Sequence, residues 1–167
     1  MKSLNSLRQN HKNWQKRMHD AVVIALGSPV RVGIYEEGHL IEEIVSDKVG
    51  SDALPEVFED LLRRYTFSRL IYVNGPGSFM GIKVTYLFLK TLSILRKVPL
   101  FALDGFFFNE NSPIKAYGKL YFVKNSNMIS LVAMEEPKLK AFNLPRSIDA
   151  KNFNTDNAPY YGIDAVG

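Results

Sequence analysis

The sequence predicts a mixed α/β fold, in which a sheet of several strands carries helices packed on it. Three short strand-like segments near the N-terminus are joined by short turns, an arrangement typical of an antiparallel meander. Two segments with helical periodicity then alternate with two short apolar strands. The predicted element order over residues 21–104 is therefore βββαβαβ.

The meander is predicted from three consecutive segments. Residues 21–26 (AVVIAL) are apolar throughout, which indicates a buried central strand. In residues 30–35 the apolar side chains recur with a period of two, as expected for a half-buried strand. Residues 40–45 form the third strand, in which Glu42 and Glu43 mark an exposed edge of the sheet.

A first helix is predicted over residues 53–65. Acidic residues in its first half and arginines at its end match the helix dipole. Its apolar side chains recur at spacings of three and four residues, which places them on a single face. These side chains are Leu54, Val57, Phe58, Leu61, Leu62 and Tyr65.

A longer helix is predicted over residues 79–97, between short buried strands at 70–73 and 100–103. Three lysines spaced seven residues apart form one narrow solvated stripe on it: Lys83, Lys90 and Lys97. Apolar side chains occupy most of the remaining circumference, nearly twice the arc of roughly 100° that an ordinary surface helix buries. One face can pack on the sheet, and the other must meet a neighbouring helix or another chain.

This apolar excess predicts a docking surface for a partner protein, because monomers rarely expose large apolar patches. The alternative is that other elements of the same domain cover both faces. We expect the partner interface to lie on the two helices and to include Leu54, Phe58, Leu61, Tyr86, Leu89 and Leu92.

A glycine-rich turn joins the strand at 70–73 to the long helix. Its glycines are not spaced as in a Walker P-loop or a Rossmann fingerprint. Two interpretations stay open. The turn is a corner that lets the helix pack closely on its strand, or the free N–H groups at the helix start bind an anion. The residues concerned are Gly75, Gly77, Ser78 and Gly81.

The second part of the chain shows a weaker pattern. Residues 116–124 and 128–134 are predicted strands around a turn at 125–127. From about residue 146 the chain is rich in Asn, Asp and Gly, and we expect a loosely ordered tail over 146–167. The region 105–145 is then a small second subdomain.

Positive charge is concentrated at the N-terminus. The first 17 residues carry five basic residues and no acid, so the net charge of +4 leaves −1 for the remaining 150 residues. A charge-based case for nucleic-acid binding therefore fails for the body of the protein. We expect residues 1–20 to be a disordered basic extension. The alternatives are an arm that touches RNA through Trp14, or translation that begins at Met18.

Composition and spacing exclude several classes of protein. Without cysteine the chain has no disulfides, thiolate catalysis or Cys-based metal sites. No apolar run approaches the roughly 20 residues of a membrane span, and the first 20 residues lack the apolar segment of a secretory signal. The expected location is the cytoplasm. Because His11, His19 and His39 are not spaced as metal ligands and Asp104 stands alone after a core strand, we predict no catalytic residue, metal or cofactor.

The element order resembles the ribonuclease-H-like layout shared by actin and sugar kinases (the ASKHA superfamily), here with a reduced C-terminal subdomain. A more specific resemblance begins at Asn74, where the segment NGPGSFMGIKV looks like the GPGSFTGLR segment of the TsaB/YeaZ family. The strand Val98–Phe101 resembles that family's I-P-L-V strand. The resemblance covers about residues 22–104.

Members of that family lack the catalytic residues of the tRNA-modification ATPase TsaD and act as its essential partner in making threonylcarbamoyladenosine next to the anticodon. The resemblance thus implies a non-catalytic scaffold that binds and activates a TsaD-like protein, with a TsaE-like ATPase and a homodimer as further partners. It implies contact with tRNA only through the complex. The contact is implied to use the helices at 53–65 and 79–97.

Several departures from the family pattern affect this expectation. The opening Asp-Thr of the family is missing, and Met80, Lys83, Thr85 and Thr91 replace the residues usual at those positions. These changes argue against nucleotide binding and reshape the helix surface. The alternative functions are a glycoprotease-like or ATP-hydrolysing enzyme of the same superfamily, and a homodimer with an unrelated interaction role.

Overall fold

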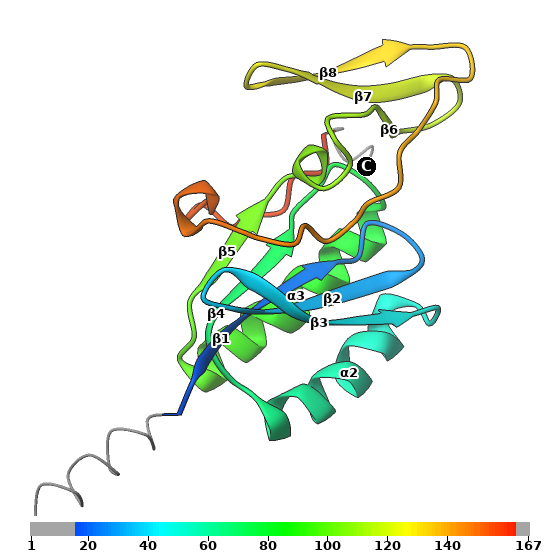
Figure 1. The fold of residues 1–167 in the computed structure, drawn as a ribbon. Helices are drawn as coiled ribbons and strands as arrows, with labels where there is room; N and C mark the ends of the chain where they lie inside the picture. The colour runs from blue at the N-terminus through cyan, green and yellow to red at the C-terminus, as the bar shows by residue number, and fades with distance from the viewer. Residues whose placement is uncertain (1–15, 163–167) are drawn as a thin grey trace, which may run out of the picture.

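The computed structural model describes residues 16–162 and contains two sheets (Figure 1). The larger sheet and its helices come from the first two thirds of the chain, and the smaller sheet follows. In chain order the elements are β1 (Met18–Ile24), β2 (Val30–Glu36), β3 (His39–Ser46), α2 (Gly50–Arg64), β4 (Thr66–Val73), α3 (Phe79–Arg96), β5 (Leu100–Leu103), a 3₁₀ turn at Gly105–Phe107, β6 (Ile114–Lys115), β7 (Leu120–Asn125), β8 (Met128–Ala133) and a 3₁₀ turn at Ala150–Asn152.

The larger sheet has the strand order β3-β2-β1-β4-β5. The pairs β1–β2 and β2–β3 are antiparallel, whereas β1–β4 and β4–β5 are parallel. The predicted mixed α/β fold with the order βββαβαβ is therefore confirmed. The first strand begins at Met18, three residues earlier than the apolar block alone indicates, because His19 and Asp20 are also buried in the sheet.

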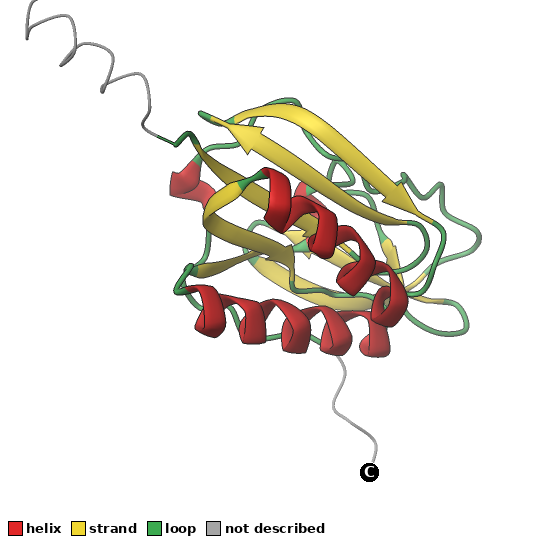
Figure 2. Cartoon of the chain, turned by 90° about the horizontal axis from the view of Figure 1, so that it is seen from below, coloured by secondary structure: helices red, strands yellow, loops and turns green. Residues whose placement is uncertain are grey.

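Both faces of the larger sheet are covered. Helices α2 and α3 lie on one face, as Figure 2 shows. Residues 142–161 cross the other face, where Leu144 and Phe153 pack against β1, β2 and β4. Alternate residues of β1 therefore enter two different cores, with Ala21 and Val23 facing the helices and Val22 facing the C-terminal segment. Burial on both faces explains why this strand is apolar throughout.

The C-terminal segment differs from the loosely ordered tail that the composition predicts. Its backbone pairs with the sheet at His39–Ser147 and at Ala102–Asn154. Tyr35 donates a hydrogen bond from its hydroxyl to the carbonyl of Pro145 (2.7 Å). Hydrogen bonds with the sheet thus satisfy backbone groups of this segment, which the local sequence does not reveal. Residues 1–15 and 163–167, where the rest of the predicted extension and tail falls, lie outside the described residues.

The second, antiparallel sheet has the order β6-β7-β8. Its strands β7 and β8 match the strands predicted at 116–124 and 128–134, with a later start for the first. Ile114 and Phe122 pack against Phe106, in a small apolar cluster between the two sheets. The side chains of Asp104, after β5, and Lys124, on β7, form an ion pair that also joins the sheets.

Candidate functional site

The glycine loop after β4 is a tightly packed corner. A Cβ on Gly75, whose φ is +124°, would lie 1.9 Å from the carbonyl oxygen of Tyr160. A Cβ on Gly81 would lie 2.6 Å from the carbonyl oxygen of Ala25, and one on Gly77 would lie 3.1 Å from the side chain of Leu26. Close approach of backbone and side chains therefore accounts for all three glycines.

Hydrogen bonds at the start of α3 also serve packing. Ser78 caps the helix by accepting a bond from the N–H of Gly81 (3.2 Å). The N–H of Ser78 donates to the carbonyl of Leu26, in the turn after β1 (3.2 Å). The C-terminal segment closes the corner, because the N–H of Tyr160 donates to the carbonyl of Asn74 (2.7 Å). The packing interpretation explains this geometry, and anion contact stays a prediction.

The structure corrects four of the six residues predicted at the partner interface. Leu54, Phe58, Leu61 and Leu89 are each at most 1% exposed and belong to the core between the helices and the sheet. Tyr86 and Leu92 are partly buried against the same core. Because Leu54, Phe58, Leu61 and Leu89 are already covered within one chain, they hold the helices on the sheet and cannot form a docking surface. Contact of a partner with the partly buried Tyr86 and Leu92 stays a prediction.

Helix α3 does expose several apolar side chains, but they are not the ones predicted for the interface. Its exposed apolar side chains are spaced seven or eight residues apart and lie along the outer face of the helix. Four of them form this row: Met80 (62% exposed), Leu87 (54%), Ile94 (67%) and Leu95 (73%). Phe79, at the helix start, is also 47% exposed, but its ring packs against that of Tyr161. Thr91 is exposed among them. We call this surface the α3 face; an uncovered apolar stripe of this kind is typical of protein–protein contact.

Lysines border the α3 face on one side. Lys83, Lys90 and Lys97 recur every seven residues next to Leu87 and Ile94 on the helix circumference. Within residues 16–162 none of the three forms an ion pair, whereas the arginines of α2, Arg63 and Arg64, are paired with carboxylates. The α3 face therefore presents an apolar centre with an unneutralised basic edge.

A hollow of about 300 Å³ continues the α3 face at the start of the helix. Its walls come from the turn between β1 and β2, the start of α2 and the start of α3. Val49, 65% exposed, lies at its edge. The residues that line it are Ala25, Gly27, Ser28, Val30, Lys48, Val49, Gly50, Ser51, Ser78, Met80, Gly81 and Val84. A side chain of a partner that docks on α3 can enter this hollow.

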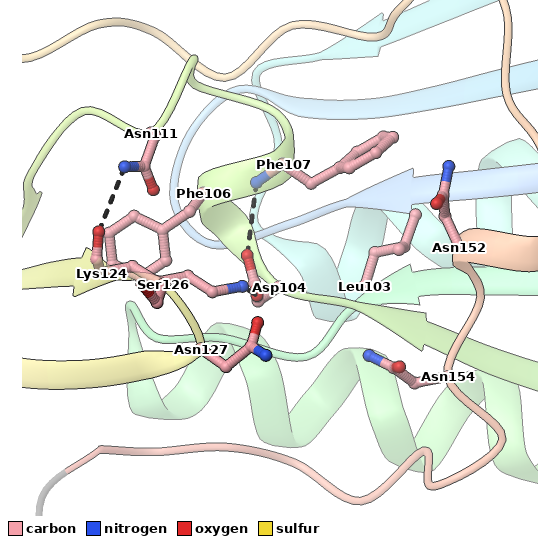
Figure 3. Close-up of a pocket in the computed structure, with 10 residues that line it drawn as sticks. All are labelled: Leu103, Asp104, Phe106, Phe107, Asn111, Lys124, Ser126, Asn127, Asn152 and Asn154. Atoms are coloured by element: carbon pink, nitrogen blue, oxygen red, sulfur yellow. Dashed lines mark hydrogen bonds and ion pairs between the residues drawn. The ribbon is translucent and has the colours of Figure 1, made fainter.

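A second open pocket, about 520 Å³ in volume, lies beyond the end of β5 (Figure 3). Asp104 does not stand alone there, because it pairs with Lys124 and accepts a hydrogen bond from the N–H of Phe107 (3.3 Å). Asparagines from distant parts of the chain complete the wall. Sequence reasoning missed this pocket, since no local pattern links its segments.

The described histidines lie apart from both surfaces. His19 is buried in β1, with Nε2 3.3 Å from Oε1 of Glu36 and its ring 4.8 Å from the ring of Tyr65. His39 begins β3, an edge strand of the sheet, where it pairs with Glu36. Within residues 16–162 no three His, Asp or Glu side chains gather as a metal site would require. Likewise, no helix in that range has the length and apolar character to cross a membrane.

Comparison with known proteins identifies solved structures with a similar fold. No family model matches the sequence, and no curated protein matches it either. YeaZ from Pseudomonas aeruginosa superposes with a TM-score of 0.51 and 15% identity, over 80% of this chain and 72% of that chain.

A second solved structure from the same organism is described as an uncharacterized protein with similarity to peptidase YeaZ. It also has a TM-score of 0.51, with 14% identity over 70% of this chain. The present chain spans 64% of that protein's length. The chain therefore has a YeaZ-like fold.

Proposed function

We propose that this protein is a non-catalytic scaffold that binds a TsaD-like protein through the α3 face and supports threonylcarbamoyladenosine modification of tRNA. The observation that carries the proposal is the α3 face itself, an uncovered apolar stripe on a protein with a YeaZ-like fold. The glycine loop, with its sequence NGPGSF, leads directly into this helix. Activity on tRNA would place the protein in the cytoplasm.

The chemistry of the α3 face supports protein docking. Met80, Leu87, Ile94 and Leu95 offer flexible aliphatic side chains that gain free energy when a partner removes them from water. Methionine in particular adapts to the shape of a facing surface. The basic edge favours a partner surface with carboxylates opposite Lys83, Lys90 and Lys97, which would orient the complex and speed its formation.

The packing of α3 supports a scaffold role for the helix. Buried residues on its inner side, among them Ile82, Thr85 and Leu89, fix its position against the sheet. The hydroxyl of Thr85 donates to the carbonyl of Gly81 (2.7 Å) and so needs no polar partner in the core. A helix held in this way presents its outer face without further ordering, which lowers the entropic cost of binding.

The function is tested by gene deletion and complementation in the source organism. Loss of the gene should lower the threonylcarbamoyladenosine content of tRNA, measured by mass spectrometry of digested nucleosides. Leu87→Glu should fail to restore the threonylcarbamoyladenosine content, because docking would have to remove the new carboxylate from water, which costs free energy. Met128→Glu is the matched control, since Met128 is 73% exposed on β8 and remote from α3. Unchanged tRNA modification after deletion would refute the proposal.

A separate assay addresses the enzyme alternative. The purified protein is incubated with ATP and Mg²⁺, and released phosphate is measured. The scaffold account expects no turnover by the protein alone. Turnover that survives Leu87→Glu would favour a catalytic member of the superfamily instead.

A further inference from the structure

Strand β8 has an open hydrogen-bonding edge. It is the last strand of the second sheet, with β7 on one side, and Figure 1 shows it on the outer margin of the molecule. Asn125 pairs with Met128 across a two-residue turn, so alternate residues from Met128 onward direct their backbone groups toward β7. The N–H and C=O groups of Ile129, Leu131 and Ala133 face away from β7, and they have no hydrogen-bond partner in the described part of the chain.

The other sheet edges among the described residues are protected against pairing with a further strand. Ala102 of β5 exchanges backbone hydrogen bonds with Asn154 of the C-terminal segment (3.0 and 2.9 Å). Strand β3 carries the carboxylates of Glu42 and Glu43, and its ladder with β2 contains a register shift. Strand β6 is only 2 residues long. Coverage, charge, bulges and short length are the usual protections of an edge strand, so β8 stands out by having none of them.

The sequence of β8 is itself suited to further pairing. Residues 129–133 (ISLVA) contain no charge, proline or glycine, and their register with β7 is regular. Leu131 and Val132, which face opposite sides of the sheet, are 39% and 40% exposed. An added strand would therefore find open backbone groups and uncovered apolar side chains on both sides of the edge.

A second copy of β8 matches this edge through a two-fold axis at Leu131. In the resulting antiparallel register Leu131 lies opposite its own copy, and Ile129 lies opposite Ala133 of the second copy, so every open N–H meets an open C=O. An axis at any other residue leaves part of the open edge unpaired. At the strand ends, Glu135 comes nearest to the uncharged Asn127 of the second copy, so no like charges face each other.

We propose that this protein forms a homodimer in which two β8 strands pair antiparallel and join the two small sheets into one, with the order β6-β7-β8-β8-β7-β6. This contact differs from the one that the family resemblance implies, which uses the two helices. The edge of one short strand buries less surface than a permanent interface, so the dimer is weak and depends on concentration. The α3 face of each copy stays open, and docking on it does not depend on the dimer.

Sedimentation equilibrium of the full chain, from micromolar to millimolar concentration, tests the dimer. The parent should show a monomer–dimer equilibrium. Leu131→Lys should weaken dimerisation at least tenfold, because the two new charges would lie opposite each other. Leu139→Lys is the matched control, since Leu139 is 47% exposed and lies outside β8; circular dichroism checks that both variants fold. A parent that stays monomeric throughout, or equal dimerisation of the two variants, would overturn the proposal.

Cysteine cross-linking tests the register, since the chain contains no cysteine. In the proposed pair the two Cα atoms at position 131 are about 5.5 Å apart, within the range of a disulfide. Leu131→Cys should therefore yield a covalent dimer on oxidation. Ser126→Cys is the control, because Ser126 is exposed in the β7–β8 turn and would lie more than about 20 Å from its copy. Equal cross-linking of the two variants would contradict the register.

One further variant separates this contact from the α3 face. Leu87→Glu should leave the dimer intact, whereas a dimer lost in Leu87→Glu and kept in Leu131→Lys would assign self-association to α3 and overturn the proposal. Binding of the TsaD-like protein should be unaffected by Leu131→Lys. Failure of the dimer and failure of the docking function are therefore distinguishable.

Discussion

The Cα of Gly75 lies against the carbonyl oxygen of Tyr160, so that no side chain fits between the glycine loop and the C-terminal segment. The neighbouring contacts have the same effect: the amide of Asn74 donates to the carbonyl of Ala158 (3.0 Å), and the rings of Phe79 and Tyr161 are 4.4 Å apart. The segment 158–161 is thus fixed on the start of α3, the helix that carries the proposed docking face.

Gly75→Ala should destabilise the protein by about 2–3 kcal/mol, because the added Cβ would overlap Tyr160 and φ is +124°. Urea unfolding followed by circular dichroism measures the loss. Gly27→Ala is the matched control, since nothing lies within 4 Å of its Cβ position, and it should change the free energy of unfolding by less than about 0.5 kcal/mol. Equal stability of the two variants would show that the corner is not packed as described.

Two leucines on α3 test which side of the helix is buried. Leu89→Ala should cost about 3 kcal/mol of unfolding free energy, because it leaves a cavity in a core where Leu89 is fully buried. Leu87→Ala should cost less than about 0.5 kcal/mol, because Leu87 is 54% exposed. Thermal or urea unfolding of both variants makes the comparison. A larger loss of stability for Leu87→Ala than for Leu89→Ala would mean that Leu87, and not Leu89, lies in the core.

The carboxylate of Asp20, 4% exposed in β1, depends on Arg69 of β4. The guanidinium donates from Nε to Oδ1 (2.9 Å) and from Nη2 to Oδ2 (2.8 Å). Arg69→Ala would leave a buried charge with only Ser68 as a side-chain donor and should cost about 3 kcal/mol in unfolding experiments. Arg69→Lys keeps the charge without the two parallel bonds, so its loss should be intermediate. A stability of Arg69→Ala close to that of the parent would contradict this role.

A pH dependence is expected from Glu42 on β3. Hydrogen bonds from Arg64 and Tyr65 lower the pKa of its carboxyl group below the usual value. A lowered pKa in the folded state contributes stability above the ordinary Glu pKa of about 4.3, and this contribution disappears as the pH falls through the folded-state pKa. Glu42→Gln should therefore cost about 0.5–1 kcal/mol at pH 7 and less at pH 3. Unfolding free energies at the two pH values provide the check; an equal cost at both would exclude the effect.

Much of the fold could be predicted because its elements have strong local periodicity. The apolar stripe of residues 54–65 and the uninterrupted apolar block 21–26 each indicate one type of element and one kind of environment. The order of elements then limits the sheet to few topologies. For the same reason the glycine loop could be placed between β4 and α3 from its sequence alone.

The exposed side of α3 could not be predicted, because a helix that is apolar on two sides does not reveal which side the sheet covers. Leu89 and Leu87 are equivalent in composition and differ only in the direction in which they face. The C-terminal segment and the pocket depend on contacts between distant residues. Nothing in the local sequence distinguishes Asn127 or Asn154, which line the pocket, from asparagines in solvated loops.

The central claim is that the α3 face binds a TsaD-like protein, and a direct measurement is the affinity between the purified protein and the TsaD-like protein of the same organism. We expect a stable complex for the parent and for Met128→Glu, and at least tenfold weaker binding for Leu87→Glu and Leu95→Glu. Leu95 and Met128 are both 73% exposed, so the two variants differ in where the new charge lies and not in how exposed the replaced side chain is. Absence of a complex, or equal affinities for Leu95→Glu and Met128→Glu, would contradict the claim.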